Sequence, residues 1–171
     1  MCNEFFKLLP KLLEESEIND PDYEKMLYIT LELNGYEQIK KINEYIGFKE
    51  LNWGEEINQE IVSTLEVTNY PNISMVENLL TIEGVDCVLI SNWLHFLKNV
   101  HPIYDKDACS ALTLMGIDIP FRPSDLTCYS KYVSVIEGLK EYAPAGALPE
   151  YALPRQKLLQ IGLACWYNKR E

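Results

Sequence analysis

The sequence has no long apolar run and no secretion signal. None of its hydrophobic stretches approaches the ~20 consecutive residues that a helix needs to cross a bilayer. Residues 1–7 lack the cationic start of a signal peptide, and no cleavage site of the usual small-residue type follows them. We therefore expect a cytoplasmic protein that has no association with a membrane.

Paired cysteines are also missing. The five cysteines, Cys2, Cys87, Cys109, Cys128 and Cys165, lie at wide and unrelated spacings, and no C-x-x-C pair is present. This excludes a zinc knuckle and a thioredoxin-like dithiol. The pattern predicts reduced thiols that are mostly buried as small apolar side chains. A nucleophilic cysteine is the alternative, and it would need a base and a lowered pKa.

Histidine is scarce, and its spacing does not favour a metal site. The two histidines, His95 and His101, are six residues apart, which does not place both on one face of a helix. A site of two histidines and the carboxylate of Asp105 is the alternative. The sequence therefore predicts no metal and no other cofactor, with His95 as a partly buried helix residue whose ring is hydrogen-bonded.

Basic residues are fewer than acidic residues. The chain has 26 acidic and 15 basic residues, a formal net charge of −11. Residues 1–70 carry 15 acidic and 6 basic residues, whereas residues 71–171 carry 11 and 9. Because nucleic acids are bound through contacts of Lys and Arg with phosphates, a DNA-binding surface would have to come from the second part. The simpler interpretation of the acidic first part is a solvated face that aids solubility.

The sequence does contain the start and stop signals of short helices. Apolar residues recur at helical spacing, and capping residues, prolines and glycines separate these segments. The predicted helices span residues 5–17, 21–33, 36–46, 55–67, 75–82, 87–97, 106–115, 126–142 and 154–168. No convincing pair of strands is present, so we predict an all-α fold. The length and the apolar content of 47% predict that residues 1–171 form a single compact helical domain.

Three predicted helix starts bear on function. Ser74 and Glu77 have the spacing of a capping box that opens the helix at residue 75. Asp86 follows a tight turn at Gly84 and is placed to cap the helix at residue 87. Asp105 is placed in the same way before the helix at residue 106.

These features combine into one motif. The sequence I-E-G-V-D at residues 82–86 is followed by a helix containing W-L-H-F-L at residues 93–97, and then by P-I-Y-D at residues 102–105. Asp105 therefore follows Gly84 by 21 residues. This arrangement resembles the helix-hairpin-helix DNA glycosylase superfamily, which includes endonuclease III and the 8-oxoguanine glycosylases, and is most similar to small uncharacterised prokaryotic relatives of it. In that superfamily a hairpin of the type L-P-G-V-G precedes a catalytic aspartate that opens a helix.

The resemblance implies a base-excision activity in DNA repair. Gly84 and Val85 would hold a DNA phosphate, because a glycine turn before a helix N-terminus lets backbone N–H groups approach it closely. Asp105 would be the catalytic carboxylate near the deoxyribose of a flipped nucleotide. The chain departs from the superfamily at Asp86, which replaces the second hairpin glycine, and at Val88, which stands where bifunctional members carry a lysine. It also lacks the four-cysteine loop of the iron–sulfur members. The implied activity is that of a monofunctional glycosylase that hydrolyses an N-glycosidic bond.

Other interpretations of the same residues remain open. Asp105 is a good helix N-cap, Gly84 and Val85 suit an ordinary turn, and Trp93 and Phe96 have the spacing of core residues. The alternative function is a non-catalytic acidic interaction domain that retains the scaffold and binds a protein partner. A third possibility is an acidic protein that mimics DNA or binds a basic partner, because residues 1–70 have a net charge of −9. DNA binding, if retained, is expected to be weak and salt-dependent.

Overall fold

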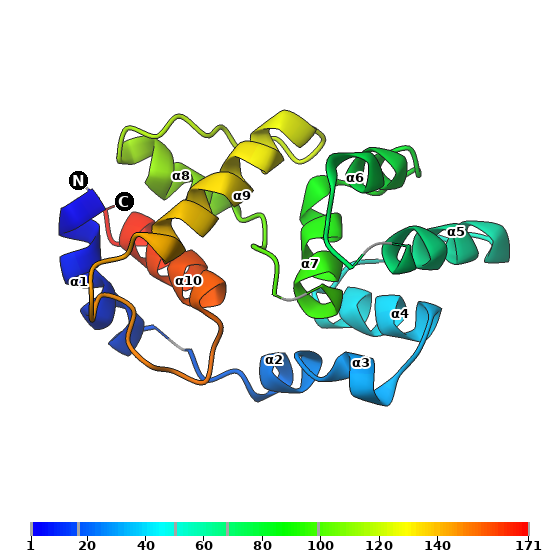
Figure 1. The fold of residues 1–171 in the computed structure, drawn as a ribbon, viewed down its shortest axis with the longest axis horizontal. Helices are drawn as coiled ribbons and strands as arrows, with labels where there is room; N and C mark the ends of the chain where they lie inside the picture. Colours follow the sequence, from blue (N-terminus) through cyan, green and yellow to red (C-terminus); the bar gives the residue numbers. More distant parts are fainter. Residues whose placement is uncertain (1, 17, 50, 68, 99, 171) are drawn as a thin grey trace. The chain divides into compact units, whose positions relative to one another are not determined.

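The protein is all-α. The computed structural model describes residues 2–16, 18–49, 51–67, 69–98 and 100–170, which form ten helices and contain no strand (Figure 1). Contacts between residues divide the chain into two compact units, Met1–Asp20 with Pro102–Glu171, and Pro21–His101. That the whole chain behaves as a single domain remains a prediction. Among the described residues, no helix has the length and apolar character needed to cross a membrane.

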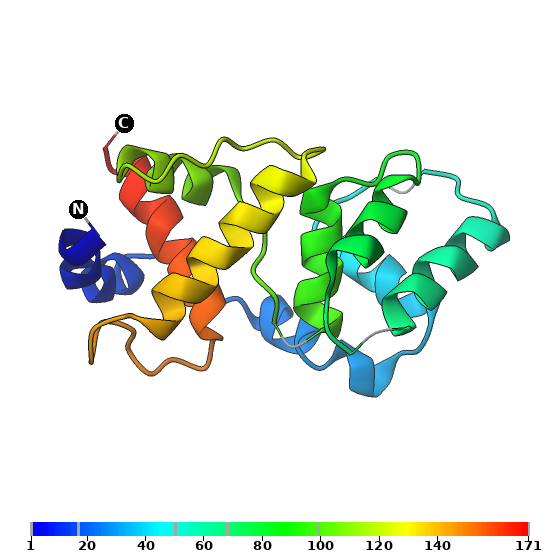
Figure 2. The same ribbon diagram turned by 45° about the horizontal axis from the view of Figure 1, so that its top comes forward.

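The unit Met1–Asp20 with Pro102–Glu171 is organised around its last helix. It contains α1 (Cys2–Glu14), α8 (Lys106–Leu114), α9 (Leu126–Glu141) and α10 (Arg155–Asn168), and α10 packs against the other three (Figures 1 and 2). The closest approach is at Gly162 of α10, where a Cβ atom would overlap the side chain of Leu9 from α1. The missing side chain is therefore what lets these two helices pack so closely.

Helix α1 continues through Pro10 as one helix of 13 residues. It buries a face of apolar residues, Phe5, Phe6, Leu9, Leu12 and Leu13, which have the spacing that the sequence predicts for a helical stripe. The expected end of this helix at residue 17 lies outside the described residues. Because proline has no backbone N–H, the helix lacks the hydrogen bond that residue 10 would otherwise donate to the carbonyl of Phe6.

The unit Pro21–His101 is organised around α7 (Cys87–Leu97), which begins and ends at the predicted residues. The other helices are α2 (Pro21–Met26), α3 (Ile29–Glu32), α4 (Tyr36–Tyr45), α5 (Glu55–Glu66) and α6 (Ile73–Leu80). Helix α7 packs against α3, α4 and α6 and is buried on nearly every side. Trp93, which the sequence predicts to face inward, is fully buried.

The predicted helix over residues 21–33 is wrong as a single element, because the chain breaks between α2 and α3. Tyr23 and Met26 of α2 and Ile29 of α3 are all buried. A continuous helix would turn Ile29 about 120° away from Tyr23 around the axis. The break at residues 27–28 allows all three side chains to enter the core, a requirement that the local sequence does not reveal.

The start of α6 also differs from the prediction. The N-cap is Asn72, whose side-chain oxygen accepts the backbone N–H of Met75 at 2.9 Å. Ser74 lies inside the helix and is exposed, so the predicted capping box of Ser74 and Glu77 is wrong. The asparagine two residues earlier supplies the acceptor, and the helix therefore begins at Ile73.

Candidate functional site

Asp105 is the N-cap of α8, as the sequence predicts. Its backbone is extended, with φ −127° and ψ 132°, and its Oδ1 accepts the backbone N–H of Ala108 at 2.8 Å. Asp105 is half-buried and follows Tyr104, which is buried. One carboxylate oxygen is therefore fixed by the helix that the residue opens.

The second carboxylate oxygen of Asp105 is held by α10. Gln160 donates from Nε2 to Oδ2 of Asp105 at 3.2 Å. The Oε1 of the same amide accepts a hydrogen bond from Lys157 Nζ at 3.1 Å. Burial lowers the pKa of Lys157, and the negative charges of Asp105 and Asp20 oppose this effect. Lys157, Gln160 and Asp105 thus form a hydrogen-bonded chain, which we call the Asp105 cluster.

A buried tyrosine and a buried cysteine interact electrostatically with Asp105. The hydroxyl of Tyr132 is buried and has no hydrogen-bond partner among the described residues. Burial raises its pKa well above the usual value, and the negative charge of Asp105 adds to the shift. Burial also raises the pKa of the Cys109 thiol to about 12, with Asp105 and Cys128 contributing. Cys109 therefore stays protonated at neutral pH and does not suit the role of a thiolate nucleophile.

The sequence predicts the position of Asp105 but not its neighbours. Lys157 and Gln160 are three residues apart, so they share a face of α10. That spacing was available in the sequence. The pairing of this face with Asp105 was not, because it depends on the packing of α8 against α10.

The turn at Gly84 connects α6 to α7. Gly84 has φ +81°, a conformation that favours glycine, and a Cβ atom there would overlap the side chain of Leu51. The backbone N–H of Val85 donates to the carbonyl of Ile82 at 3.1 Å, and the Val85 side chain is buried. Trp53 donates from its indole nitrogen to the carbonyl of Glu83 at 3.0 Å. The turn is thus packed against the segment before α5.

Asp86 caps α7, as the sequence predicts. Its Oδ1 accepts the backbone N–H of Leu89 at 2.9 Å. The N-terminal end of α7, where the resemblance places a DNA phosphate, therefore already carries a carboxylate that satisfies one of its free N–H groups. A phosphate at this position would have to approach a negative charge.

The three residues singled out for DNA chemistry do not share a unit. Gly84 and Val85 lie in one turn of the unit Pro21–His101, and Asp105 belongs to the other unit. His95, considered with Asp105 as a metal ligand, is buried. Its Nε2 lies 2.6 Å from the Tyr23 hydroxyl and its Nδ1 lies 2.7 Å from the His101 carbonyl oxygen. In the parts of the chain that the structure describes, no group of three or more His, Cys, Asp or Glu side chains is arranged to hold a metal ion.

No protein-family model matches this chain, and neither does any curated protein or solved structure. The resemblance of residues 82–105 to the glycosylase superfamily therefore remains a prediction from the sequence.

Proposed function

We propose that this protein is a monofunctional DNA glycosylase-like enzyme of base-excision repair, with Asp105 as its catalytic carboxylate. The observation that supports the proposal is the Asp105 cluster. Both oxygens of Asp105 are hydrogen-bonded, one by the N-terminus of α8 and one by Gln160. A lysine whose pKa is lowered by burial completes the chain. Ionisable groups with shifted pKa values beside a fixed carboxylate are typical of catalytic sites.

The proposed chemistry needs a carboxylate in a fixed position. When the bond between a base and its deoxyribose breaks, positive charge develops on the sugar ring, and a nearby carboxylate stabilises it. The same group can accept a proton from the water that attacks the sugar carbon. The two hydrogen bonds of Asp105 orient its carboxylate group before the nucleotide arrives, so no reorganisation is required during the reaction. We also propose that the protein is cytoplasmic.

For DNA binding, we propose that α6, the Gly84 turn and α7 form the helix-hairpin-helix element. Gly84 and Val85 would lie against a backbone phosphate. Residues 21–101 carry 13 acidic and 5 basic residues, and Asp86 lies at the N-terminus of α7. Because few cations are available to replace counterions on DNA, we expect weak binding that is lost as salt is added.

A second candidate is a non-catalytic interaction domain that binds a protein partner. The position of Asp86 favours it, because the Asp86 carboxylate caps the helix end that would otherwise be available to a phosphate. In this case Asp105 serves only as the cap of α8.

Release of damaged bases from a panel of lesion-containing duplexes at low salt tests the proposal. The parent protein is expected to release at least one lesion base, and Asp105→Asn is expected to reduce the rate by a factor of about 100 or more. Asp107→Asn is the matched control, because Asp107 also lies in the first turn of α8 and its side chain bonds to Asn168 rather than to the cluster. Equal rates for the parent and Asp105→Asn, or no release from any duplex, would leave the interaction domain as the function.

A further inference from the structure

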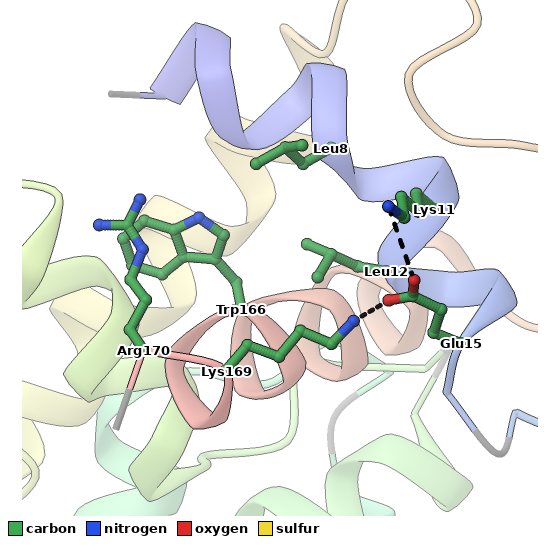
Figure 3. Close-up of a pocket in the computed structure, with 7 residues that line it drawn as sticks. All are labelled: Leu8, Lys11, Leu12, Glu15, Trp166, Lys169 and Arg170. Carbon is green, nitrogen blue, oxygen red and sulfur yellow. Dashed lines mark ion pairs between the residues drawn. The ribbon is translucent and has the colours of Figure 1, made fainter.

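A pocket between α1 and α10 has the composition of a small-ligand site. Its volume is about 220 Å³. It is lined by two leucines of α1, the indole of Trp166, and four charged side chains, Lys11, Glu15, Lys169 and Arg170 (Figure 3). All of these residues belong to one unit, and Asp105 is not among them.

The pocket is positive in an otherwise acidic protein. Three of its lining side chains are cationic and one is acidic, whereas the chain has a net charge of −11. Glu15 pairs with Lys11 at 3.9 Å and with Lys169. Arg170 forms no ion pair with any residue that the structure describes, and its guanidinium carbon lies 3.7 Å from the centroid of the Trp166 ring. A cation stacked on an apolar ring, without an acidic partner, remains available to an anion.

Trp166 supplies a second unmatched donor at the same place. Its side chain is 4% exposed, and its indole nitrogen is buried with no hydrogen-bond partner among the described residues. Figure 3 shows this nitrogen on the edge of the ring that faces Leu8 of α1. An indole N–H can only donate, so a buried one without an acceptor is unfavourable. Leu8 lies over this edge and is partly exposed, so its side chain has room to move aside.

We propose that this pocket binds a small amphipathic carboxylate, an aliphatic or aromatic acid of about ten non-hydrogen atoms. An apolar cavity of about 150 Å³ holds a benzene molecule, so a pocket of about 220 Å³ accommodates a somewhat larger body. The planar guanidinium of Arg170 matches a carboxylate with two parallel hydrogen bonds. The Trp166 N–H donates to the same head group, and Leu8 and Leu12 contact the apolar body.

The test compares octanoate with octanamide, which has the same size and shape but no charge. Calorimetric titration of the full chain, below the concentration at which octanoate forms micelles, is expected to show saturable binding of octanoate. Octanamide is expected to bind about tenfold more weakly, because hydrogen bonds to a charged group are stronger than neutral ones. Arg170→Gln should reduce octanoate affinity about tenfold and leave octanamide affinity unchanged.

Two further variants separate the site from general effects. Trp166→Phe keeps the apolar wall and removes the N–H, so it should weaken octanoate binding severalfold. Arg155→Gln removes a cation from the other end of α10 and should leave the affinity unchanged. Circular dichroism and a thermal melt confirm that each variant is folded, and Arg170 is exposed, so its replacement is compatible with the fold.

Several results would overturn the assignment. Equal binding of octanoate and octanamide would show an apolar crevice without anion recognition, and so would full octanoate affinity in Arg170→Gln. If neither compound binds saturably, the pocket does not bind a ligand of this class. If sedimentation shows a dimer that Arg170→Gln disrupts, the occupant is a second copy of this chain. None of these measurements involves base release, so the result is independent of the proposed glycosylase activity.

Discussion

The indole N–H of Trp93 donates to Oδ1 of Asn43 at 2.8 Å, and both side chains are fully buried. The bond joins α7 to α4 inside the unit Pro21–His101. Asn43→Ala removes the acceptor of this indole N–H and leaves a buried donor without a partner, so we expect a loss of about 1–3 kcal/mol in the free energy of unfolding. Urea denaturation followed by tryptophan fluorescence measures this change.

The control for this substitution is Asn78→Ala. Asn78 is an exposed residue of α6, and an exposed substitution of this kind changes stability by only about 0.5 kcal/mol. A loss in Asn43→Ala no larger than that in Asn78→Ala would show that the buried bond contributes little.

Two glycines inside helices should respond to alanine in opposite ways. At Gly138 of α9, no atom beyond the local helix backbone lies within 4 Å of the place that a Cβ atom would occupy, so Gly138→Ala is expected to stabilise the protein by about 0.5–1 kcal/mol through helix propensity. At Gly162 of α10 the added methyl group overlaps the end of the Leu9 side chain, which is fully buried and would have to repack within the core. Gly162→Ala is therefore expected to destabilise by about 1–3 kcal/mol despite the same propensity gain. Thermal melts of the two variants decide the matter, and stabilisation by both would contradict the close packing of α1 and α10.

The two functions considered for Asp105 predict different stability and activity patterns. Asp105→Asn keeps a side-chain oxygen for the Ala108 N–H, so it should cost at most about 1 kcal/mol. Asp105→Ala removes the cap and should cost about 1–2 kcal/mol. If Asp105 is catalytic, both variants lose base release even though only the second loses the cap. Activity that survives in Asp105→Asn would leave the residue as a cap alone.

Asp86 offers a test of DNA binding that preserves the fold. Asp86→Asn keeps an oxygen acceptor for the Leu89 N–H and removes the negative charge at the N-terminus of α7. If the Gly84 turn lies against a phosphate, duplex affinity at low salt should increase several-fold. Glu77→Gln makes the same change of charge at an exposed position of α6 and should have a smaller effect. Equal effects of the two variants would point to net charge rather than to contact at the turn.

Burial of the Cys109 thiol is expected to make the free energy of unfolding fall as pH rises above neutral. Its pKa is about 12 in the folded protein and about 8.5 in an unfolded chain. Between these values the folded state keeps the proton and the unfolded state loses it, so the free energy of unfolding falls as pH rises. The difference in stability between the parent and Cys109→Ala should therefore shift against the parent from pH 8 to pH 10. A constant difference would contradict the assigned burial of the thiol, and so would alkylation of native Cys109 as fast as that of half-buried Cys165.

The features that the sequence predicts correctly are those set by neighbouring residues. Asp86 and Asp105 cap the helices that they precede, because an N-cap depends only on the next three residues. The break between α2 and α3 was missed because it depends on which side chains the rest of the unit buries. The start of α6 was misplaced because Asn72 and Ser74 are both good capping residues, and the sequence does not say which one the turn before α6 favours.

The candidate site can likewise be predicted only in part. Asp105 could be found from its local pattern, whereas Lys157, Gln160 and Tyr132 could not be assigned to it. They lie on α10 and α9, and the packing of α10 against both α8 and α9 brings them near the aspartate. Sequence periodicity identifies which face of a helix is apolar, but it does not identify the helix that the face will meet.

The close contact of Leu9 with Gly162 has a consequence for biosynthesis. Helix α1 leaves the ribosome before α10, with the whole of Pro21–His101 made between them. During that interval the apolar face of α1 has no α10 to cover it, while the unit Pro21–His101 already has all of its residues. The nascent chain must therefore keep an amphipathic segment from aggregating until α10 has been made.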